Sequence, residues 1–183
     1  MKQGILLYGP PASGKDTITS VLAGLDQRYV PFSRLKIGTG RTHGYRMASL
    51  RELAQLEERG DLLYRNDRYD NTYVVDRPGI QEATSGGKVP VIHLGQIAGV
   101  HAVADGFPAR WCRVVLWCRR ETAERRSAGR GDGDTAARLK AWDATELDIA
   151  QGRGVEWDLR VDTDSSSPQD AAEQIHTMVT ALG

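Results

Sequence analysis

The sequence predicts an α/β protein in which helices cover both faces of a parallel sheet, a three-layer α/β/α arrangement. Three observations lead to this fold class. Short apolar runs suited to buried strands alternate with segments of helical periodicity. The first of these runs leads through a glycine-rich turn straight into a helix. The 183 residues suit a single domain, 1–183, because they can bury a sizeable core and contain no internal repeat or low-complexity tail.

The first half of the chain contains short apolar strands and capped helices. The predicted elements are strand 4–8, helix 17–23, strand 29–33, helix 50–59 and helix 78–84. Ser49 and Glu52 form a capping box that begins the helix at 50, and Gly60 ends it. Residues 34–46 are basic and glycine-rich, and residues 61–73 are polar and aromatic. Neither stretch has enough periodicity to predict an element.

The second half continues the alternation. The predicted elements are strand 89–94, helix 97–104, strand 114–118, helices 122–127 and 135–150, strand 159–162 and helix 168–182. The two uninterrupted apolar runs are typical of central parallel strands. The longer helix carries Leu139, Trp142 and Leu147 on or near one face. Ser167 is the expected cap of the final helix, with Pro168 at its first position.

Composition restricts the expected partners. Lysine plus arginine and aspartate plus glutamate number 24 each, so no overall field favours nucleic acid or a membrane. No apolar run approaches the length of a membrane span. Because no secretory signal is visible, we expect a cytoplasmic protein whose Cys112 and Cys118 are free buried thiols. We expect a small-molecule partner and a monomer or homodimer.

Residues 9–17 read Gly-Pro-Pro-Ala-Ser-Gly-Lys-Asp-Thr and fit the phosphate-binding P-loop, with Asp16 where Ser or Thr normally follows the lysine. The glycines allow close approach, so successive backbone N–H groups can face an anion at a helix N-terminus. The expected nucleotide-binding residues are Gly9, Pro10, Ala12, Ser13, Gly14, Lys15, Asp16 and Thr17. We expect a nucleoside triphosphate with Mg²⁺, Lys15 meeting the β/γ-phosphates and Thr17 helping to hold the metal.

Four segments carry a resemblance to a known family. They are the P-loop, the stretch 32–49 ending Gly44-Tyr45-Arg46-Met47-Ala48-Ser49, the pair Gly60-Asp61-Leu62-Leu63 and Asn71-Thr72-Tyr73, and residues 124–131 with Arg138-Leu139. In this order they resemble the guanylate kinases, a branch of the nucleoside monophosphate kinases, over nearly the whole chain. The resemblance implies an acceptor-binding insertion at about 33–88 and a mobile lid at about 125–138.

The resemblance implies an ATP- and Mg²⁺-dependent kinase that moves the γ-phosphoryl group to a small phosphorylated acceptor. A transferring phosphoryl group spreads negative charge over its oxygens, so positioned cations supply most of the catalysis. The expected catalytic residues are Lys15, Asp16, Arg130 and Arg138, with Arg126 also near the triphosphate. The expected acceptor residues are Lys36, Arg41, Tyr45, Tyr64, Tyr73 and Gln96.

Two departures from that family leave the acceptor open. Tyr64 stands where the family has a glutamate that reads guanine, and residues 93–96 replace its acidic strand end. A site without those carboxylates loses its discrimination for guanine. The Gly-Lys-Asp-Thr sequence is similar to the ribose 1,5-bisphosphate phosphokinases, which also lack the strand carboxylates. A sugar bisphosphate or another specialised metabolite is therefore an alternative acceptor.

Several residues have two interpretations. Asp16 either replaces the missing strand acid in holding the metal or its water, or simply favours the dipole of the first helical turn. Asp70 and Asp76 are candidate bases if the acceptor is a hydroxyl. His43 lies in the expected acceptor loop, whereas His93 on a central strand is expected in the core. The histidines and cysteines show no metal-ligand spacing.

Two functions from other classes stay open. A non-catalytic guanylate-kinase-like interaction module would have the same fold, but such modules generally have a degraded P-loop. A nucleotide hydrolase would need a residue that positions water, and the sequence offers no clear candidate.

Overall fold

A computed structural model gives the structure of residues 1–68, 70–129, 135–151 and 154–182. The strands are β1 (Gln3–Tyr8), β2 (Tyr29–Pro31), β3 (Leu35–Ile37), β4 (Arg46–Met47), β5 (Leu62–Arg68), β6 (Asn71–Asp76), β7 (Val89–Leu94), β8 (Arg110–Trp117) and β9 (Leu159–Asp162). The helices are α1 (Lys15–Leu25), α2 (Leu50–Glu58), α3 (Arg77–Ala83), α4 (Ile97–Gly106), α5 (Arg120–Ala128), α6 (Thr135–Gln151) and α7 (Pro168–Leu182), with a 3₁₀ turn at Ser85–Gly87. None of these helices has a stretch long and apolar enough to cross a bilayer.

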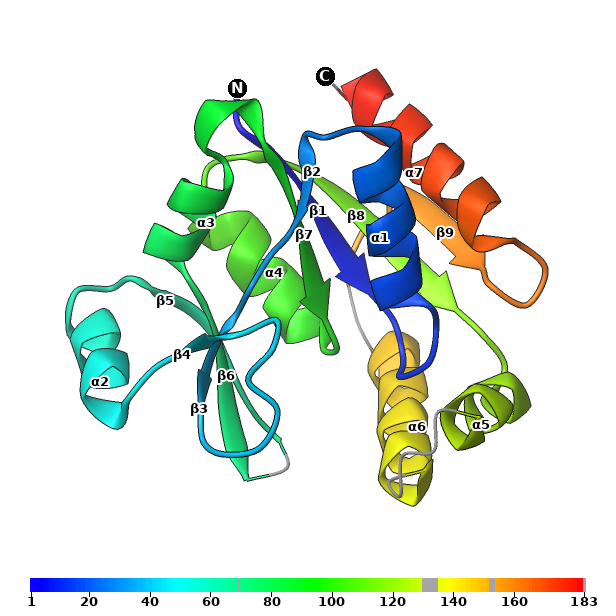
Figure 1. The fold of residues 1–183 in the computed structure, drawn as a ribbon, viewed down its shortest axis with the longest axis horizontal. Helices are drawn as coiled ribbons and strands as arrows, with labels where there is room; N and C mark the ends of the chain where they lie inside the picture. Colours follow the sequence, from blue (N-terminus) through cyan, green and yellow to red (C-terminus); the bar gives the residue numbers. More distant parts are fainter. Residues whose placement is uncertain (69, 130–134, 152–153, 183) are drawn as a thin grey trace.

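A five-stranded parallel sheet forms the centre of the fold, in the order β2-β7-β1-β8-β9 (Figure 1). Its register places Leu6 beside Ile92 on one side and Arg113 on the other. All five expected strands are present in this sheet. β1 and the P-loop therefore lie in the middle, where the carboxyl ends of parallel strands form a ligand site in α/β folds.

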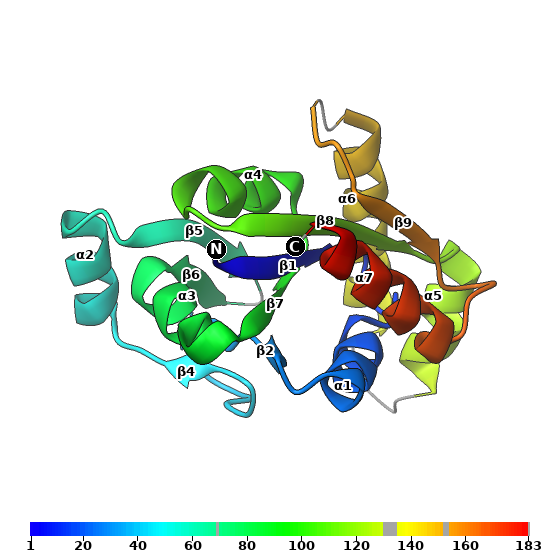
Figure 2. The same cartoon turned by 90° about the horizontal axis from the view of Figure 1, so that it is seen from above.

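The two faces of the sheet bury alternate side chains of β1. Ile5 and Leu7 belong to one core cluster with residues of α1 and α7, and Leu6 and Tyr8 belong to a second cluster with residues of α4. Figure 2 shows α4 on one face and α1 with α7 on the other. This confirms the predicted three-layer α/β/α arrangement. The physical reason is that a strand whose successive residues are all apolar must be covered on both faces.

A second, four-stranded sheet has the order β4-β3-β6-β5 and was not predicted. β5 and β6 form an antiparallel hairpin, and β3 pairs antiparallel with β6 and parallel with β4. From Tyr64 to Arg68 the residues of β5 alternate between half-buried and exposed, with polar side chains in both places. Polar residues on both faces erase the apolar alternation by which a strand is recognised in a sequence.

A partly buried ion pair lies at the end of β6, where the chain leaves the second sheet for α3. Asp76, whose side chain is 2% exposed, pairs with the Arg46 guanidinium and accepts a hydrogen bond from the Gly79 amide at 2.9 Å, which caps α3. Arg46 Nε also donates to the Ser33 carbonyl at 2.9 Å. The interpretation of Asp76 as a base is therefore wrong, because its buried carboxylate is engaged by the Arg46 guanidinium and the Gly79 amide. Asp70 is exposed in the β5–β6 turn.

Local signals at the helix ends are confirmed. Ser49 and Glu52 form the expected capping box of α2. Ser167 accepts from the Asp170 amide at 3.1 Å at the start of α7. Both cysteines are free and buried, and burial raises the pKa of the Cys112 thiol to about 12.

Candidate active site

The P-loop connects β1 to α1 in a conformation that requires its glycines. Gly9 has φ +157°, and a Cβ there would lie 2.3 Å from the Leu116 carbonyl oxygen. Gly14, with φ +91°, is the N-cap of α1, and Lys15 is the first residue of that helix. Successive amides therefore lead into a helix N-terminus, which is a favourable place for phosphate.

The Lys15 ammonium lies over the loop itself. Its Nζ donates to the carbonyls of Gly9 and Pro10, both at 2.7 Å, and to Ser13 Oγ at 3.4 Å. Burial, and to a smaller extent the charges of Arg34 and Arg68, lower the pKa of Lys15 to about 8, against the opposing field of Asp16. These contacts hold the ammonium beside the amides that would receive an anion.

The lowered pKa of Lys15 predicts a pH dependence of nucleotide binding. The free protein loses the Lys15 proton above pH 8. The neutral amine must then take up a proton again before it can bind phosphate as an ammonium. We expect the affinity for ATP to fall by about eightfold from pH 7.5 to pH 9, since each unit above the pKa reduces the protonated fraction up to tenfold. Calorimetric titration at several pH values measures this. A flat profile in the native protein would contradict it, and a Lys15→Ala variant should show no such slope.

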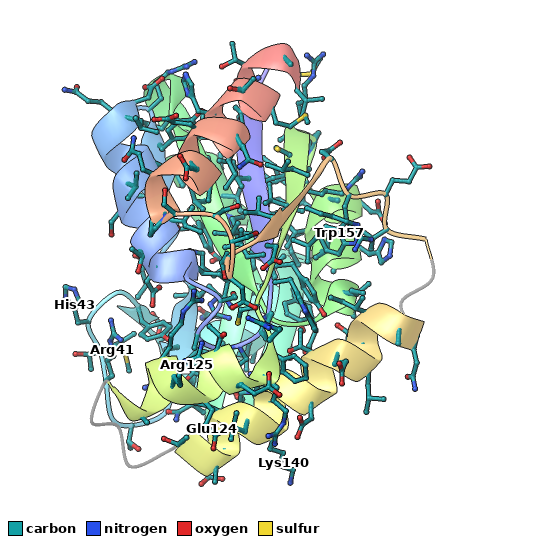
Figure 3. All side chains as sticks on the ribbon, turned by 90° about the vertical axis from the view of Figure 1, so that its right-hand side faces the viewer. Arg41, His43, Glu124, Arg125, Lys140 and Trp157 are labelled. Carbon is teal, nitrogen blue, oxygen red and sulfur yellow. The ribbon has the colours of Figure 1, made fainter. Side chains whose placement is uncertain are left out.

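A cavity of about 400 Å³ separates the P-loop from the second sheet. Residues from both sheets and from α6 line it: Gly9, Pro11, Lys15, Asp16, Pro31, Phe32, Arg34, Arg41, His43, Gly44, Tyr45, Asn66, Arg68, Tyr73, His93, Leu94, Gly95, Arg138 and Thr145. In Figure 3, Arg41 and His43 lie at the same end of the molecule as α5 and α6. Of the residues predicted for the acceptor, Arg41, Tyr45 and Tyr73 line this cavity.

The wall opposite the P-loop combines arginines with tyrosines. The Arg34 guanidinium lies 5.1 Å from the centre of the Tyr73 ring, and the Tyr45 and Tyr73 rings are 5.4 Å apart. Arg34 and Arg68 were not predicted as site residues. Arg34 lies in the donor-rich stretch 34–46, which was a usable signal, whereas Arg68 reaches the cavity only because β5 pairs with β6.

Three predicted residues have different roles in the structure. The buried Lys36 ammonium donates to the carbonyls of Thr39 and Arg41, at 2.5 and 2.8 Å, and so shapes the loop that carries Arg41. The Tyr64 hydroxyl donates to Gln96 Oε1, and neither residue is among those that line the cavity. Burial raises the pKa of Tyr64 to about 12. All three side chains are thus engaged in structural contacts, which an acceptor would have to replace.

The predicted lid arginines divide into two cases. Arg126 donates to the Ala12 carbonyl at 3.0 Å and to Thr163 Oγ1 and O at 3.1 and 2.7 Å, so it braces the P-loop against the loop after β9. Arg138, in the first turn of α6, lines the cavity as expected. Arg130 lies outside the described residues.

His93 faces the site and was expected in the core. Its Nε2 lies 2.7 Å from Thr19 Oγ1, and its Nδ1 lies 3.4 Å from Asp16 Oδ1. Burial, and then the charge of Lys15, lower the pKa of His93 to about 4, so the ring is neutral at pH 7. The ring therefore lies beside the Asp16 carboxylate at the mouth of the P-loop.

The oxygen ligands beside the P-loop suit Mg²⁺. Within the described residues, no three His, Cys, Asp or Glu side chains lie close enough to hold a metal ion by themselves. Mg²⁺ in kinases is commonly held by one or two protein oxygens together with substrate phosphates and water. The Asp16 carboxylate lines the cavity, and the exposed Thr17 hydroxyl is one residue further along α1. This donor set fits a metal that arrives with a nucleotide.

The parallel sheet, the P-loop and the arginine-lined cavity define the class as the P-loop kinases. A sequence model of the chloramphenicol phosphotransferase-like proteins matches residues 3–180, and the chain belongs to this family. No curated protein matches the chain in sequence.

Two of the solved structures that share the fold are a guanylate kinase and the protein APE1195. Guanylate kinase from Anaplasma phagocytophilum superposes with a TM-score of 0.66 at 15% sequence identity, over 98% of this chain and 86% of that one. The protein APE1195 superposes with a TM-score of 0.53 at 17% identity, over 100% of this chain and 99% of that one. At these identities the likeness concerns the fold, and it agrees with the resemblance to guanylate kinases seen in the sequence.

Proposed function

We propose that this protein is an ATP-dependent kinase that transfers the γ-phosphoryl group to a small acceptor that already carries phosphate. The observation that supports this best is the charge of the cavity wall opposite the P-loop. Arg34, Arg41 and Arg68 all line that wall, while Asp16 is the one carboxylate among the described lining residues. Three guanidinium groups along one wall favour an acceptor that carries negative charge, because a guanidinium forms strong charge-assisted hydrogen bonds to phosphate.

Each part of the site has a role in this proposal. Lys15 and the P-loop amides bind the β- and γ-phosphates, and Arg138 approaches the transferring group from α6. Arg34, Arg41 and Arg68 hold the acceptor phosphate, with the Tyr45 and Tyr73 hydroxyls as further donors. Asp16 and Thr17 would hold Mg²⁺, which when bound would neutralise charge on the phosphates. The protein contributes positioning and electrostatic stabilisation and forms no covalent bond to the phosphoryl group.

A phosphate acceptor requires no catalytic base. An acceptor phosphate is ionised at pH 7 and needs no proton removed, whereas a hydroxyl acceptor is helped by a base within hydrogen-bond reach. Among the described residues that line the cavity, Asp16, His43 and His93 could serve as such a base, and two of them, Asp16 and His93, lie beside each other at the P-loop. The family's name nonetheless makes chloramphenicol a necessary test compound.

The acceptor class is tested by ADP release from Mg-ATP with GMP, dGMP, AMP, CMP, UMP, ribose 1,5-bisphosphate and chloramphenicol. We expect phosphorylated compounds to be preferred over chloramphenicol. With the best acceptor, Arg68→Ala should raise the acceptor KM by about 30-fold, since a charged hydrogen bond contributes about 2 kcal/mol, and change kcat much less.

Arg65→Ala is the matched control for Arg68→Ala. Arg65 lies on the same strand, but its guanidinium is 44% exposed and pairs with Asp67 and Glu57. Its replacement should leave the acceptor KM within about twofold, as for most exposed ion pairs. A preference for chloramphenicol, or equal effects of the two variants, would contradict the proposal. ATP turnover that no acceptor increases would instead favour a nucleotide hydrolase.

A further inference from the structure

Helix α6 brings Arg138 to the cavity, and contacts further along the helix hold it in place. Thr145, two turns after Arg138, also lines the cavity. The Trp142 indole Nε1 donates to the Cys118 carbonyl at 3.0 Å, at the end of β8. The position of Arg138 relative to the P-loop therefore depends on how α6 is attached to the parallel sheet.

Asp148 forms a polar attachment in the last turn of α6. Its Oδ2 accepts a hydrogen bond from the Ile97 amide at 2.7 Å and a second from the Tyr8 hydroxyl at 3.0 Å. Tyr8 Oη also lies 3.4 Å from the Thr145 carbonyl oxygen. Tyr8 is fully buried and immediately precedes Gly9 of the P-loop. One carboxylate thus joins α6 to the start of α4 and to the strand that carries the P-loop.

Both hydrogen bonds satisfy groups that need a partner. The Ile97 amide is the first N–H of α4, and such an N–H has no acceptor within its own helix. The residue before it, Gln96, makes no side-chain cap in the described structure, and its Oε1 accepts from Tyr64. A carboxylate at a helix N-terminus is also favoured by the helix dipole. Removing Asp148 would leave the Ile97 amide without its acceptor and the buried Tyr8 hydroxyl with only the longer contact to the Thr145 carbonyl, so α6 would have to shift or admit water.

Because Asp148 lies far from Arg138 along α6, a small tilt of the helix at Asp148 displaces Arg138 in the site. Arg138 and Asp148 are ten residues apart, about 15 Å along a helix axis. A tilt of about 4° at the Asp148 end would move the helix at Arg138 by about 1 Å. Displacements of about this size in a catalytic group can cost on the order of 100-fold in rate.

We propose that Asp148 is a positioning residue for phosphoryl transfer: by binding the Ile97 amide and the Tyr8 hydroxyl, it fixes α6 so that Arg138 meets the transferring group. The inference rests on the proposed kinase function. It adds that the P-loop strand, α4 and α6 share one carboxylate, so the cation on α6 is held in register with the phosphate-binding loop.

A double-mutant cycle with Arg138 tests the proposal. Asp148→Ala should lower kcat at least tenfold with the best acceptor and leave the KM for ATP within about threefold. Asp148→Asn keeps a carbonyl oxygen that can accept from both donors, so it should restore kcat to within about threefold of the native value. In an Arg138→Ala background, Asp148→Ala should cost less than threefold more, because there is then no guanidinium to misplace.

A general loss of structure would give a different result. If Asp148 only stabilised the fold, its effect would be the same with and without Arg138, and that additivity would overturn the proposal. A native kcat in Asp148→Ala, or a loss in Asp148→Asn as large as in Asp148→Ala, would overturn it as well. Asp143→Ala is the matched control, because Asp143 lies on the same helix in an exposed pair with Arg120. It should leave kcat within about twofold.

A ligand-free measurement separates this inference from the kinase proposal. Amide hydrogen exchange should be faster in residues 135–151 and at the start of α4 in Asp148→Ala than in the native protein, with β1 and β8 unchanged. If no acceptor supports transfer by the native protein, the proposed function fails and exchange alone decides whether Asp148 fixes α6. Unchanged exchange in both segments would overturn the inference.

Discussion

Lys15→Ala is expected to reduce phosphoryl transfer by at least about 10³-fold while the protein stays folded. Lys15 is the cation that the structure holds against the P-loop carbonyls, 2.7 Å from two of them, where the β- and γ-phosphates would bind. Its loss removes electrostatic stabilisation from the charge that develops during transfer, which is the main contribution of proteins to this reaction. Steady-state ADP release measures the loss, and circular dichroism with a thermal melt measures the fold.

Lys88→Ala is the control for Lys15→Ala. Lys88 is exposed, and its ammonium donates to the Gln27 carbonyl at 2.8 Å, away from the cavity. Its replacement should leave the rate within about twofold. Because Lys15 is enclosed and its pKa is lowered to about 8, its removal should not lower the melting temperature substantially. Transfer that persists in a folded Lys15→Ala protein would refute the role proposed for Lys15 and the P-loop in binding the phosphates.

Arg138→Ala is expected to lower kcat by about 10³-fold with a smaller effect on the KM for ATP. An arginine that meets the transferring phosphoryl group acts mainly in the transition state, and residues of this kind contribute about 10³- to 10⁵-fold to kcat. Arg138→Lys keeps the charge without the planar fork and should recover only part of the rate. Single-turnover kinetics separates the chemical step from nucleotide binding.

The control for Arg138→Ala is Arg120→Ala, which removes an exposed arginine of α5 that pairs with Asp143. It should leave kcat nearly unchanged, because exposed ion pairs contribute little and this one lies away from the cavity. A fall in affinity for ATP with an unchanged rate for the chemical step would show that Arg138 binds the ground state only. Its predicted catalytic role would then be wrong.

Features made by neighbouring residues could be predicted from the sequence. The P-loop is one short segment, so its glycines, Lys15 and the start of α1 are recognisable without knowing the fold. The capping box of α2 and the cap of α7 are local for the same reason. The parallel sheet followed from apolar runs buried on both faces, because a continuous run can satisfy only that environment.

The sequence could not predict which cations line the cavity wall. Lys36 and Arg126 are cations at positions that resemble a known family, yet the first donates to the Thr39 and Arg41 carbonyls and the second to the Ala12 carbonyl. A charged side chain close to a backbone carbonyl binds it, and the sequence does not record that proximity. Arg68 faces the cavity because of the register between β5 and β6, which polar residues on both faces do not reveal.

The sequence alone determined the phosphate-binding loop and the succession of strands and helices that form the parallel sheet, because these depend on short segments and their periodicity. The tertiary structure decided which cations line the cavity, which ones brace the loops, and how Asp148 joins residues 51 and 140 positions away in the chain. Side-chain partners of that kind are chosen by distance in space. They appear only once both sheets and α6 are in place.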